Sequence, residues 1–258
     1  MKYIIKKKKE PKSLTAKRNT EGACYDSPQL DWQEQLLDEQ GYLCAYCMGR
    51  ISLKLNKNFE PSIGIEHYLS EQLCRQRGLD SELRWENMLG VCNGASGSSG
   101  SKFHCDKTNG TKKGKAYGNI ELNILNPLDI TKSEKLITYD LFGQILPNTK
   151  NEDLQQKIAE DLNYILNLND EKLRQFRLDA MDLAKKILKE KYPTGNWTPK
   201  QIEKEIKEWR SKSKMLVKEI EGDSSKKAVI KRGGEYRAYC QAAIWFLEYL
   251  KSKPIHKS

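Results

Sequence analysis

The sequence predicts an α+β protein whose two halves differ in character. Residues 42–105 are irregular, contain two short strand-like segments and hold five of the seven cysteines. From about Asn151 onward, apolar residues recur at the i, i+3, i+4 spacing of amphipathic helices. With 258 residues, the chain is long enough for one large domain or two smaller ones.

Composition sets the broad class of the protein. Hydrophobic residues make up 38% and charged residues 31% of the chain, and the mean hydropathy of −0.76 is typical of a soluble globular protein. The length excludes a peptide hormone or a disulfide mini-protein. The longest uncharged apolar-rich run, Ala238 to Leu247, is far shorter than the roughly 20 residues of a bilayer span. The lysines at 6–9 lead into Glu10 and Pro11, so we expect no secretory signal, no membrane partner and a cytoplasmic location.

Charge is spread unevenly over the chain. The net charge is +10, with +7 in residues 1–20, −5 in 21–105, +2 in 106–150 and +6 in 151–258. Basic flanks favour a polyanionic partner such as nucleic acid, because lysine and arginine supply sequence-independent attraction to phosphate. The alternative is a lysine-rich surface that serves only solubility.

The first half begins with a basic arm, residues 1–26, that has little periodicity. Residues 26–41 predict a helix, with Ser27 as N-cap, Pro28 in the first turn and Gly41 past its end. The apolar stripe of this helix consists of Leu30, Trp32, Leu36 and Leu37. Short strands are expected at Ser62–Tyr68 and Met88–Cys92.

The second half is predicted to be one hairpin followed by helices. Leu136–Tyr139 and Gln144–Leu146 bracket Gly143 and predict the hairpin. The helices are expected at Leu154–Leu168, Glu171–Lys191, Pro199–Glu221 and Glu235–Lys251. Thr198 to Gln201 has the pattern of a capping box, and Asn169 and Asp170 can cap the helix that begins at Glu171. We divide the chain into the arm 1–26, a cysteine-containing module 27–130 and a hairpin plus helical module 131–258.

The cysteines predict a metal site. Cys44 and Cys47 form a two-residue-spaced knuckle that can direct both thiolates into one tetrahedral site, and Cys92 and Cys105 complete a four-cysteine zinc set. A redox pair at Cys44 and Cys47 is the alternative, but the strand-to-helix context of such pairs is missing. The other cysteines fall outside this set: Cys24 is isolated, Cys74 sits in a polar turn, and Cys240 lies on the apolar face of the last helix.

One histidine stands next to a carboxylate that could act with it in catalysis. His67 follows Glu66 in a strand-like segment between the two halves of the cysteine set. Phosphodiester cleavage needs a base for the attacking water and a cation for the charge on the leaving oxygen, which an imidazole beside a carboxylate-bound Mg2+ supplies. Since adjacent residues of a regular strand face opposite ways, the pair can serve one phosphate only where the strand ends or bulges. A Glu-His pair without function is the other interpretation.

The order of these motifs resembles the HNH, or ββα-metal, nuclease pattern. It runs from Cys-x-x-Cys to Ile65–His67, then to Trp85–Cys92 and Cys105–Lys107. The resemblance implies a small zinc-clamped ββα-metal nuclease module followed by a mainly α-helical C-terminal module. It also implies that His67 is the general base and that Glu66 binds a catalytic Mg2+ or Mn2+.

The same resemblance assigns the remaining site residues. Asn87 holds the His67 loop and orients its imidazole, and Asp106 is the last ligand of the catalytic metal. Because the segment between Cys92 and Cys105 leaves the register open, His104 and Asn109 are alternatives to Asp106. The basic residues beyond this point are expected to bind nucleic acid, namely Lys107, Lys112 and Lys113.

Further segments resemble one HNH subfamily, the PtuB-type effector of Septu antiphage systems and their retron-associated relatives. They are Leu36–Cys47 ahead of Ile65–His67, then Leu125–Leu128 and Leu166–Leu173, followed by Arg177. This resemblance implies a bacterial defence effector controlled by a partner ATPase of the PtuA type. In retron versions, a reverse transcriptase with its multicopy single-stranded DNA is a further partner.

Two rival functions come from other classes. The first is a catalytically silent, zinc-stabilised nucleic-acid-binding adaptor for the ATPase, and the second is a zinc-dependent redox switch. The aromatic residues of the last helix suit either a buried core or a docking surface for the ATPase.

Overall fold

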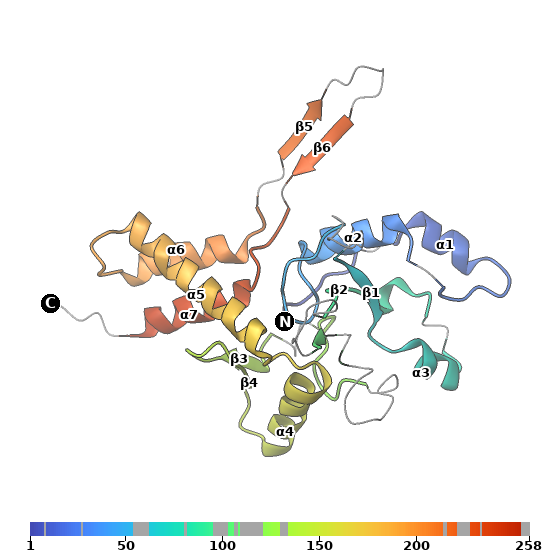
Figure 1. Cartoon of the computed structure of the whole chain (residues 1–258), viewed down its shortest axis with the longest axis horizontal. Coiled ribbons are helices and arrows are strands. Elements are labelled where there is room, and N and C mark those ends of the chain that lie inside the picture. Colours follow the sequence, from blue (N-terminus) through green and yellow to red (C-terminus); the bar gives the residue numbers. More distant parts are fainter. Residues whose placement is uncertain are drawn as a thin grey trace.

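The computed structural model describes residues 1–7, 9–26, 28–53, 62–79, 82–94, 103–105, 108, 121–129, 134–213, 216–220, 228–232 and 234–253. These residues form two lobes that meet around the N-terminus (Figure 1). The elements of the first lobe are α1 (Lys12–Arg18), α2 (Leu30–Gln40), β1 (Gly64–His67), α3 (Glu71–Gln76), η1 (Trp85–Asn87) and β2 (Met88–Val91). The rest are β3 (Ile137–Tyr139), β4 (Ile145–Pro147), α4 (Glu152–Glu160), η3 (Asp161–Ile165), α5 (Glu171–Lys191), α6 (Pro199–Arg210), β5 (Leu216–Ile220), β6 (Ala228–Arg232) and α7 (Cys240–Ser252). Helices and small sheets together make the α+β class that the sequence predicts.

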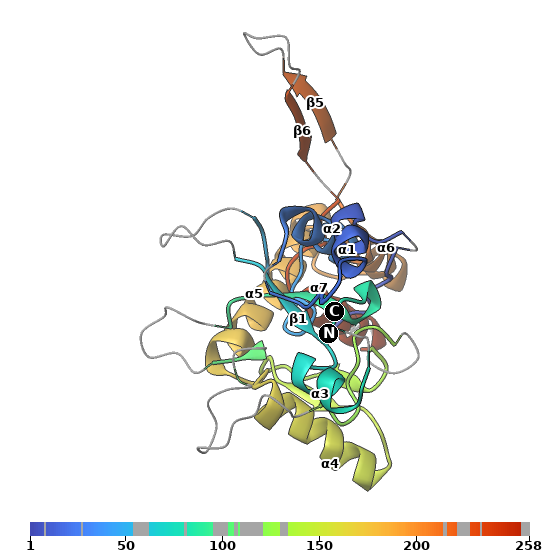
Figure 2. The same ribbon diagram turned by 90° about the vertical axis from the view of Figure 1, so that its right-hand side faces the viewer.

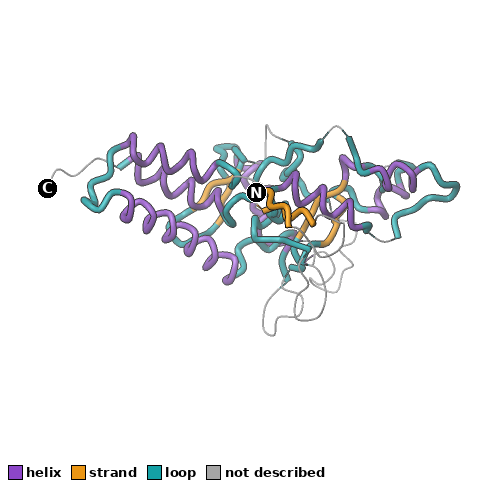
Figure 3. Tube along the Cα trace, turned by 90° about the horizontal axis from the view of Figure 1, so that it is seen from above, coloured by secondary structure: helices purple, strands orange, loops and turns teal. Residues whose placement is uncertain are grey.

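All three sheets of the described residues are antiparallel pairs of short strands. β1 pairs with β2, so that Ile65 lies opposite Gly90 and His67 lies opposite Met88. β3 pairs with β4 around Gly143, whose φ of +72° is favourable for glycine. Both pairs confirm strand predictions. Seen from above, the strands lie in the middle part of the molecule, and helices lie to either side of them (Figure 3).

Helix α2 ends as predicted but begins later. Gly41 adopts a left-handed φ of +60°, and a Cβ there would lie 2.4 Å from Cδ2 of Tyr236. The helix starts at Leu30, with Gln29 as an N-cap that makes no side-chain hydrogen bond; the predicted cap Ser27 lies outside the described residues. Leu30 was expected in the buried stripe but is 62% exposed, since at about 100° per residue it falls at the edge of the buried face.

The first 26 residues pack into the core along part of their length. The predicted arm with little periodicity contains α1, and Met1, Ile4 and Leu14 are at most 5% exposed. The backbone N–H of Ile4 donates to the carbonyl of Pro127 at 2.8 Å. The net charge of the segment hides these buried positions, because it does not show where the few apolar residues stand.

The helical half departs from its prediction at three helix ends. The helix expected at Leu154–Leu168 is α4 followed by the π-helical turn η3. The helix expected at Glu235–Lys251 starts only at Cys240, because the N–H of Tyr236 and the N–H of Tyr239 donate to carbonyls at Gly41 and Met48 instead of within a helix. In contrast, α5 has the predicted bounds, and the predicted capping box between Thr198 and Gln201 is present.

The third departure is the end of the helix predicted at Pro199–Glu221. α6 ends at Arg210, where Ser211 is extended, and the chain continues into β5 and β6. β6 contains two adjacent β-branched residues, Val229 and Ile230, which favour a strand. The β5–β6 hairpin projects away from both lobes in two perpendicular views (Figures 1 and 2).

The two lobes share their apolar cores. One cluster includes Trp32 and Leu89 together with Ile158 and Ala242. A second cluster packs Leu43 and Met48, which flank the cysteine knuckle, among residues of α5, α6 and α7. The predicted boundary between modules near residue 130 stays a prediction.

Buried polar side chains also join the parts of the chain. Asp161 is fully buried and accepts hydrogen bonds from the backbone N–H groups of residues 123–125 at 2.7 to 2.9 Å. Arg177 is 1% exposed and donates to the carbonyls of Gly143 at 2.5 Å and Leu168 at 2.8 Å. Asn169 exchanges two hydrogen bonds with the backbone of Ile145 in β4. Leu166–Leu173 and Arg177, which the subfamily resemblance singled out, therefore lie where these parts of the chain are joined.

Among the described residues, no helix has the length and apolarity needed to cross a membrane. The aromatic helix α7 contributes Cys240, Ala243 and Leu247 to the core, while Trp245 is half-buried and stacks on Tyr249 with ring centroids 5.7 Å apart. This helix is therefore mainly a core element.

Candidate functional site

Four cysteines gather at one point, and they are the four that the sequence predicted. The Sγ atoms of Cys44, Cys47, Cys92 and Cys105 all lie within 4.8 Å of one another. Sγ–Sγ distances are 3.9 Å for Cys44–Cys105 and 3.8 Å for both Cys47–Cys92 and Cys92–Cys105. A tetrahedral Zn2+ with Zn–S bonds of about 2.3 Å requires Sγ–Sγ distances of about 3.8 Å. The donor set therefore fits zinc.

The knuckle gets its shape from local hydrogen bonds. The N–H of Cys44 donates to the carbonyl of Gly49 at 2.9 Å, and the N–H of Gly49 donates to Sγ of Cys47 at 3.3 Å. Met48 completes the turn with a left-handed φ of +66°. Ala45, between the two thiols, donates its N–H to the carbonyl of Gly90 in β2 at 3.0 Å. The knuckle is thus tied directly to the strand that leads to Cys92.

Cys105 is held by the helical half. Its N–H donates to the carbonyl of Leu166 at 2.8 Å, and its φ of +56° turns the chain sharply at this point. Nδ2 of Asn167 donates to the carbonyl of Phe103 at 2.8 Å. The four ligands consequently come from the knuckle, the end of β2 and a segment fixed by the second lobe.

The thiols perturb one another strongly. Burial raises the pKa of Cys44, but hydrogen bonds from Cys105, Cys47 and Cys92 outweigh that effect and hold its pKa well below the usual value. Burial and hydrogen bonds with Cys44, Cys47 and Cys92 raise the pKa of Cys105 well above the usual value. One thiolate is therefore stabilised by its neighbours, and a divalent cation would allow all four to bind as thiolates.

His104 lies against this cluster. Its Nδ1 is 3.2 Å from Sγ of Cys105 and 3.9 Å from Sγ of Cys92, and the residue is 8% exposed. Its role as an alternative last ligand of a catalytic metal at Glu66 stays a prediction. The other expectations for this stretch, Asp106, Lys107, Asn109, Lys112 and Lys113, lie outside the described residues.

Glu66 and His67 occupy the last two positions of β1. Glu66 is opposite Leu89 and half-buried, and His67 is opposite Met88 and 6% exposed. Because the regular strand ends at His67, the alternation of side-chain faces does not continue beyond this pair. Both residues are still paired with β2, and the action of their side chains on one phosphate stays a prediction.

Asn87 fastens the loop that comes after His67. Its Oδ1 accepts from the N–H of Leu69 at 2.8 Å, and its Nδ2 donates to the carbonyl of Leu69 at 2.9 Å. The backbone is tied as well, since the N–H of Tyr68 donates to the carbonyl of Asn87 at 2.9 Å. This side chain therefore fixes the chain two residues beyond the histidine.

Side chains from α2 and from the N-terminal segment also form hydrogen bonds to the backbone of β2. Gln40 uses its side-chain amide to donate to the carbonyl of Gly90 and to accept from its N–H, both at 2.7 Å. Nζ of Lys6 donates to the carbonyl of Met88 at 2.8 Å, lies 3.9 Å from the ring centroid of Trp85 and pairs with Glu39 at 3.3 Å. A two-stranded sheet of four-residue strands has little stability alone, so these contacts supply its support.

Sequence reasoning missed the residues that surround His67. Nε2 of His67 is 2.7 Å from the carbonyl oxygen of Glu82, and Nδ1 is 3.7 Å from Oε1 of Glu71. Tyr25, from the N-terminal segment, places its ring edge-on to the imidazole with centroids 4.5 Å apart. One signal was available for Glu71: Ser70 is a good N-cap, and its side chain accepts from the N–H of Leu73. That signal predicts a helix directly after the histidine loop.

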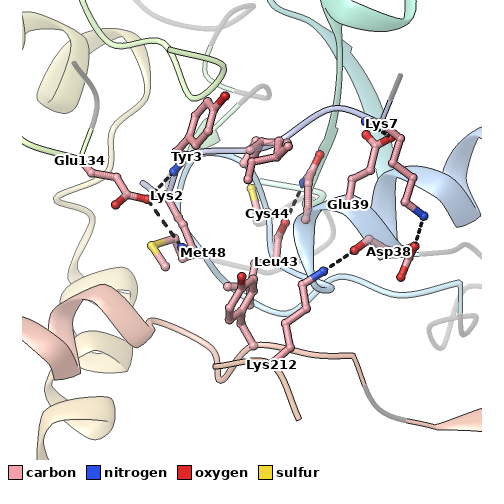
Figure 4. Close-up of a pocket in the computed structure, with 15 residues that line it drawn as sticks. Lys2, Tyr3, Lys7, Asp38, Glu39, Leu43, Cys44, Met48, Glu134 and Lys212 are labelled. Atoms are coloured by element: carbon pink, nitrogen blue, oxygen red, sulfur yellow. Dashed lines mark hydrogen bonds and ion pairs between the residues drawn. The ribbon is translucent and has the colours of Figure 1, made fainter. Parts of the chain in front are cut away.

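A separate cavity of about 480 Å³ lies behind the knuckle, between the N-terminal segment, α2 and residues 212 and 236 (Figure 4). Its lysines are engaged within the chain: Lys7 pairs with Asp38, Lys212 donates to the carbonyl of Asp38 at 2.6 Å, and Lys2 lies 3.7 Å from Glu134. The cavity therefore lies where segments of the chain meet, and we do not interpret it as a second, charged binding site.

Comparison with known proteins gives one relative of interest. No protein-family model matches the chain. Over 126 residues the chain is 29% identical to an Escherichia coli protein named "Retron Ec83 putative HNH endonuclease". The match covers 45% of this chain and 47% of that protein, so the chain spans about half the length of the relative. The similarity supports the HNH resemblance, and the PtuB and Septu part of the prediction stays a prediction.

Proposed function

We propose that this protein is a metal-dependent HNH endonuclease that hydrolyses phosphodiester bonds in nucleic acid, DNA or tRNA. The observation that carries the proposal is the joint placement of three features on one pair of strands. Glu66 and His67 end β1, Asn87 fastens the loop after them, and the four-cysteine cluster closes the other end of the pair at Cys92. The similarity to a protein named HNH endonuclease supports the same function.

In this proposal His67 is the general base. Its Nε2 faces a carbonyl oxygen, which only accepts, so Nε2 carries the proton and the lone pair is at Nδ1. Nδ1 takes a proton from water as the water oxygen bonds to phosphorus and the bond to the leaving oxygen breaks. Asn87 keeps the imidazole in place by holding the loop.

The two metals have different tasks. The four cysteines hold a structural Zn2+ that takes no part in the chemistry. Glu66, with Asp106 as the second ligand, would hold the catalytic Mg2+ or Mn2+. When bound, this metal supplies positive charge for the leaving oxygen. Lys107, Lys112 and Lys113 would contact the phosphates of the substrate.

The biological setting is part of the proposal. The relative's name places it with a retron, which supports a role as the toxic effector of a bacterial antiphage system of the Septu or retron-associated kind. In that setting a PtuA-type ATPase controls the nuclease in the cytoplasm, and a reverse transcriptase with its multicopy single-stranded DNA is the further partner.

One observation favours the second candidate, a catalytically silent adaptor that binds nucleic acid for the ATPase. His67 is 6% exposed, and the ring of Tyr25 packs edge-on against its imidazole. A general base must come within hydrogen-bond reach of the water it activates. In the endonuclease proposal, Tyr25 therefore moves aside when substrate binds.

The test is cleavage of plasmid DNA and of total tRNA with Mg2+ or Mn2+ by the full chain, alone and with a PtuA-type ATPase. The variants are His67→Ala and Glu66→Gln, with Glu152→Gln as a matched control because Glu152 is exposed on the first turn of α4. Cutting of one substrate that is lost in both site variants and kept in the control would establish the nuclease and its target. Zinc-loaded, folded protein that never differs from His67→Ala would favour the adaptor.

A further inference from the structure

The two ring nitrogens of His67 face two different glutamates, Glu82 and Glu71, and Arg75 contacts the carboxylates of both. Nε2 meets the main-chain carbonyl of Glu82 at 2.7 Å, and Nδ1 meets Oε1 of Glu71 at 3.7 Å. Nη2 of Arg75 lies 3.4 Å from Oε2 of Glu71 and 3.1 Å from Oε2 of Glu82. These contacts close a ring from His67 through Glu71, Arg75 and Glu82 back to His67.

The contact at Nδ1 is of a different kind from that at Nε2. When Nε2 donates to the carbonyl of Glu82, a neutral imidazole presents a lone pair at Nδ1. A carboxylate oxygen is also an acceptor, and 3.7 Å is too long for a direct hydrogen bond. One water molecule within about 2.8 Å of both atoms can donate an O–H to each.

We infer that Glu71 is a positioning residue for the hydrolytic water, an inference that rests on the proposed endonuclease function. The water donates one O–H to Nδ1 of His67 and the other to Oε1 of Glu71, which directs an oxygen lone pair toward the phosphorus. The O–H proton at Nδ1 passes to the imidazole as the oxygen–phosphorus bond forms and the bond to the leaving oxygen breaks; the leaving oxygen then takes a proton from solvent. Arg75 keeps the Glu71 carboxylate aligned through its second oxygen.

The surroundings suit this role. The side chain of Glu71 is 34% exposed, so water reaches it, while that of His67 is 5% exposed and fixed from its other side. Ser70 caps α3 and sets the direction of its first residue, Glu71. Glu71 therefore stands on a rigid turn, four residues after the base that it assists.

The first test reads the tautomer of His67 and needs no activity. In long-range 1H–15N spectra of the full chain, with His67→Ala to assign the signals, we expect the neutral imidazole of His67 to carry its proton on Nε2. A dominant Nδ1–H form would overturn the inference, because the nitrogen that faces Glu71 could then not accept the proton of water.

The second test separates positioning from binding. Glu71→Gln keeps the shape of the side chain but places an amide donor against Nδ1, so we expect kcat on the substrate that wild type cleaves to fall by about 10- to 100-fold while KM changes less than about 2-fold. Arg77→Met is the matched control for lost surface charge at the end of α3, because Arg77 pairs with Glu121 and not with the ring. Arg75→Met is expected to lower kcat partly.

The outcomes distinguish the inference from the function on which it rests. Activity lost in His67→Ala but unchanged in Glu71→Gln would refute the role of Glu71 and leave the endonuclease intact. Activity unchanged in His67→Ala would refute both. A Glu71→Gln variant that raises KM alone would show a role in substrate binding and would also overturn the inference.

Discussion

Replacing Cys44 by serine removes one of the four sulfur atoms that surround the predicted zinc position. Structural zinc sites contribute about 10–16 kcal/mol of binding free energy in small domains, so one ligand of four accounts for about 2.5–4 kcal/mol. A stability change of 1 kcal/mol moves the Tm of a chain of this size by about 2–4 °C, and the expected fall in Tm is therefore about 5–16 °C.

The assay for Cys44→Ser combines zinc content per chain by atomic absorption with thermal unfolding by circular dichroism. Cys24→Ser is the matched control, since Cys24 is exposed and outside the cluster, and it should keep both zinc and Tm. A Cys44→Ser protein that is free of zinc yet melts like wild type would refute the four-cysteine assignment. So would a variant that keeps one tightly bound zinc and an unchanged Tm.

Three further variants test single contacts. Asn87→Ala removes both hydrogen bonds to Leu69 and should lower the free energy of unfolding in urea by about 2–3 kcal/mol; a loss below about 0.5 kcal/mol would contradict the clamp. Asp161→Asn places an amide N–H donor against backbone N–H donors and should lower the free energy of unfolding by about 3 kcal/mol in the same assay. Burial lowers the pKa of Lys6 to about 8 against the opposing effect of Glu39, so the unfolded chain holds more protons between about pH 8 and pH 10.5. Stability should therefore rise with pH in this window by up to about 3 kcal/mol, and Lys6→Met should abolish that part of the rise.

Elements with strong local signals could be predicted from the sequence. The strands around Glu66 and Leu89, the hairpin around Gly143 and the bounds of α5 all derive from turn residues, caps and periodicity. The four clustered cysteines could be predicted as well, because a cysteine has few other uses at such spacing.

Other features depend on contacts between segments that are distant in the sequence. β5 was predicted as helix, since its leucine, lysine and glutamate are also good helix formers, and only pairing with β6 decides its state. α7 starts late because the backbone of Tyr236 and Tyr239 bonds to the knuckle region. Tyr25 and Glu82 reach His67 through the tertiary fold, and no local pattern marks them.

The strand pair β1–β2 connects the cysteine cluster to the proposed nuclease site. Its two strands have four residues each, which is too short to be stable alone, and the contacts that support it come from Gln40, Asn87 and the knuckle at Ala45. The knuckle contact runs to Gly90, one residue away from the position opposite Glu66. Loss of zinc should therefore disorder the register at Glu66 and His67 before the helices melt.

That order of events can be measured. After treatment with a zinc-selective chelator and return of Mg2+, amide hydrogen exchange should accelerate in β1 and β2 by at least about 10-fold, while α5 and α6 keep their protection. Cleavage should fall in parallel and return when zinc is restored. If exchange in β1 and β2 stayed slow while zinc was absent, the cysteine cluster would not be the feature that holds the strand pair, and support from Gln40 and Asn87 alone would have to be sufficient.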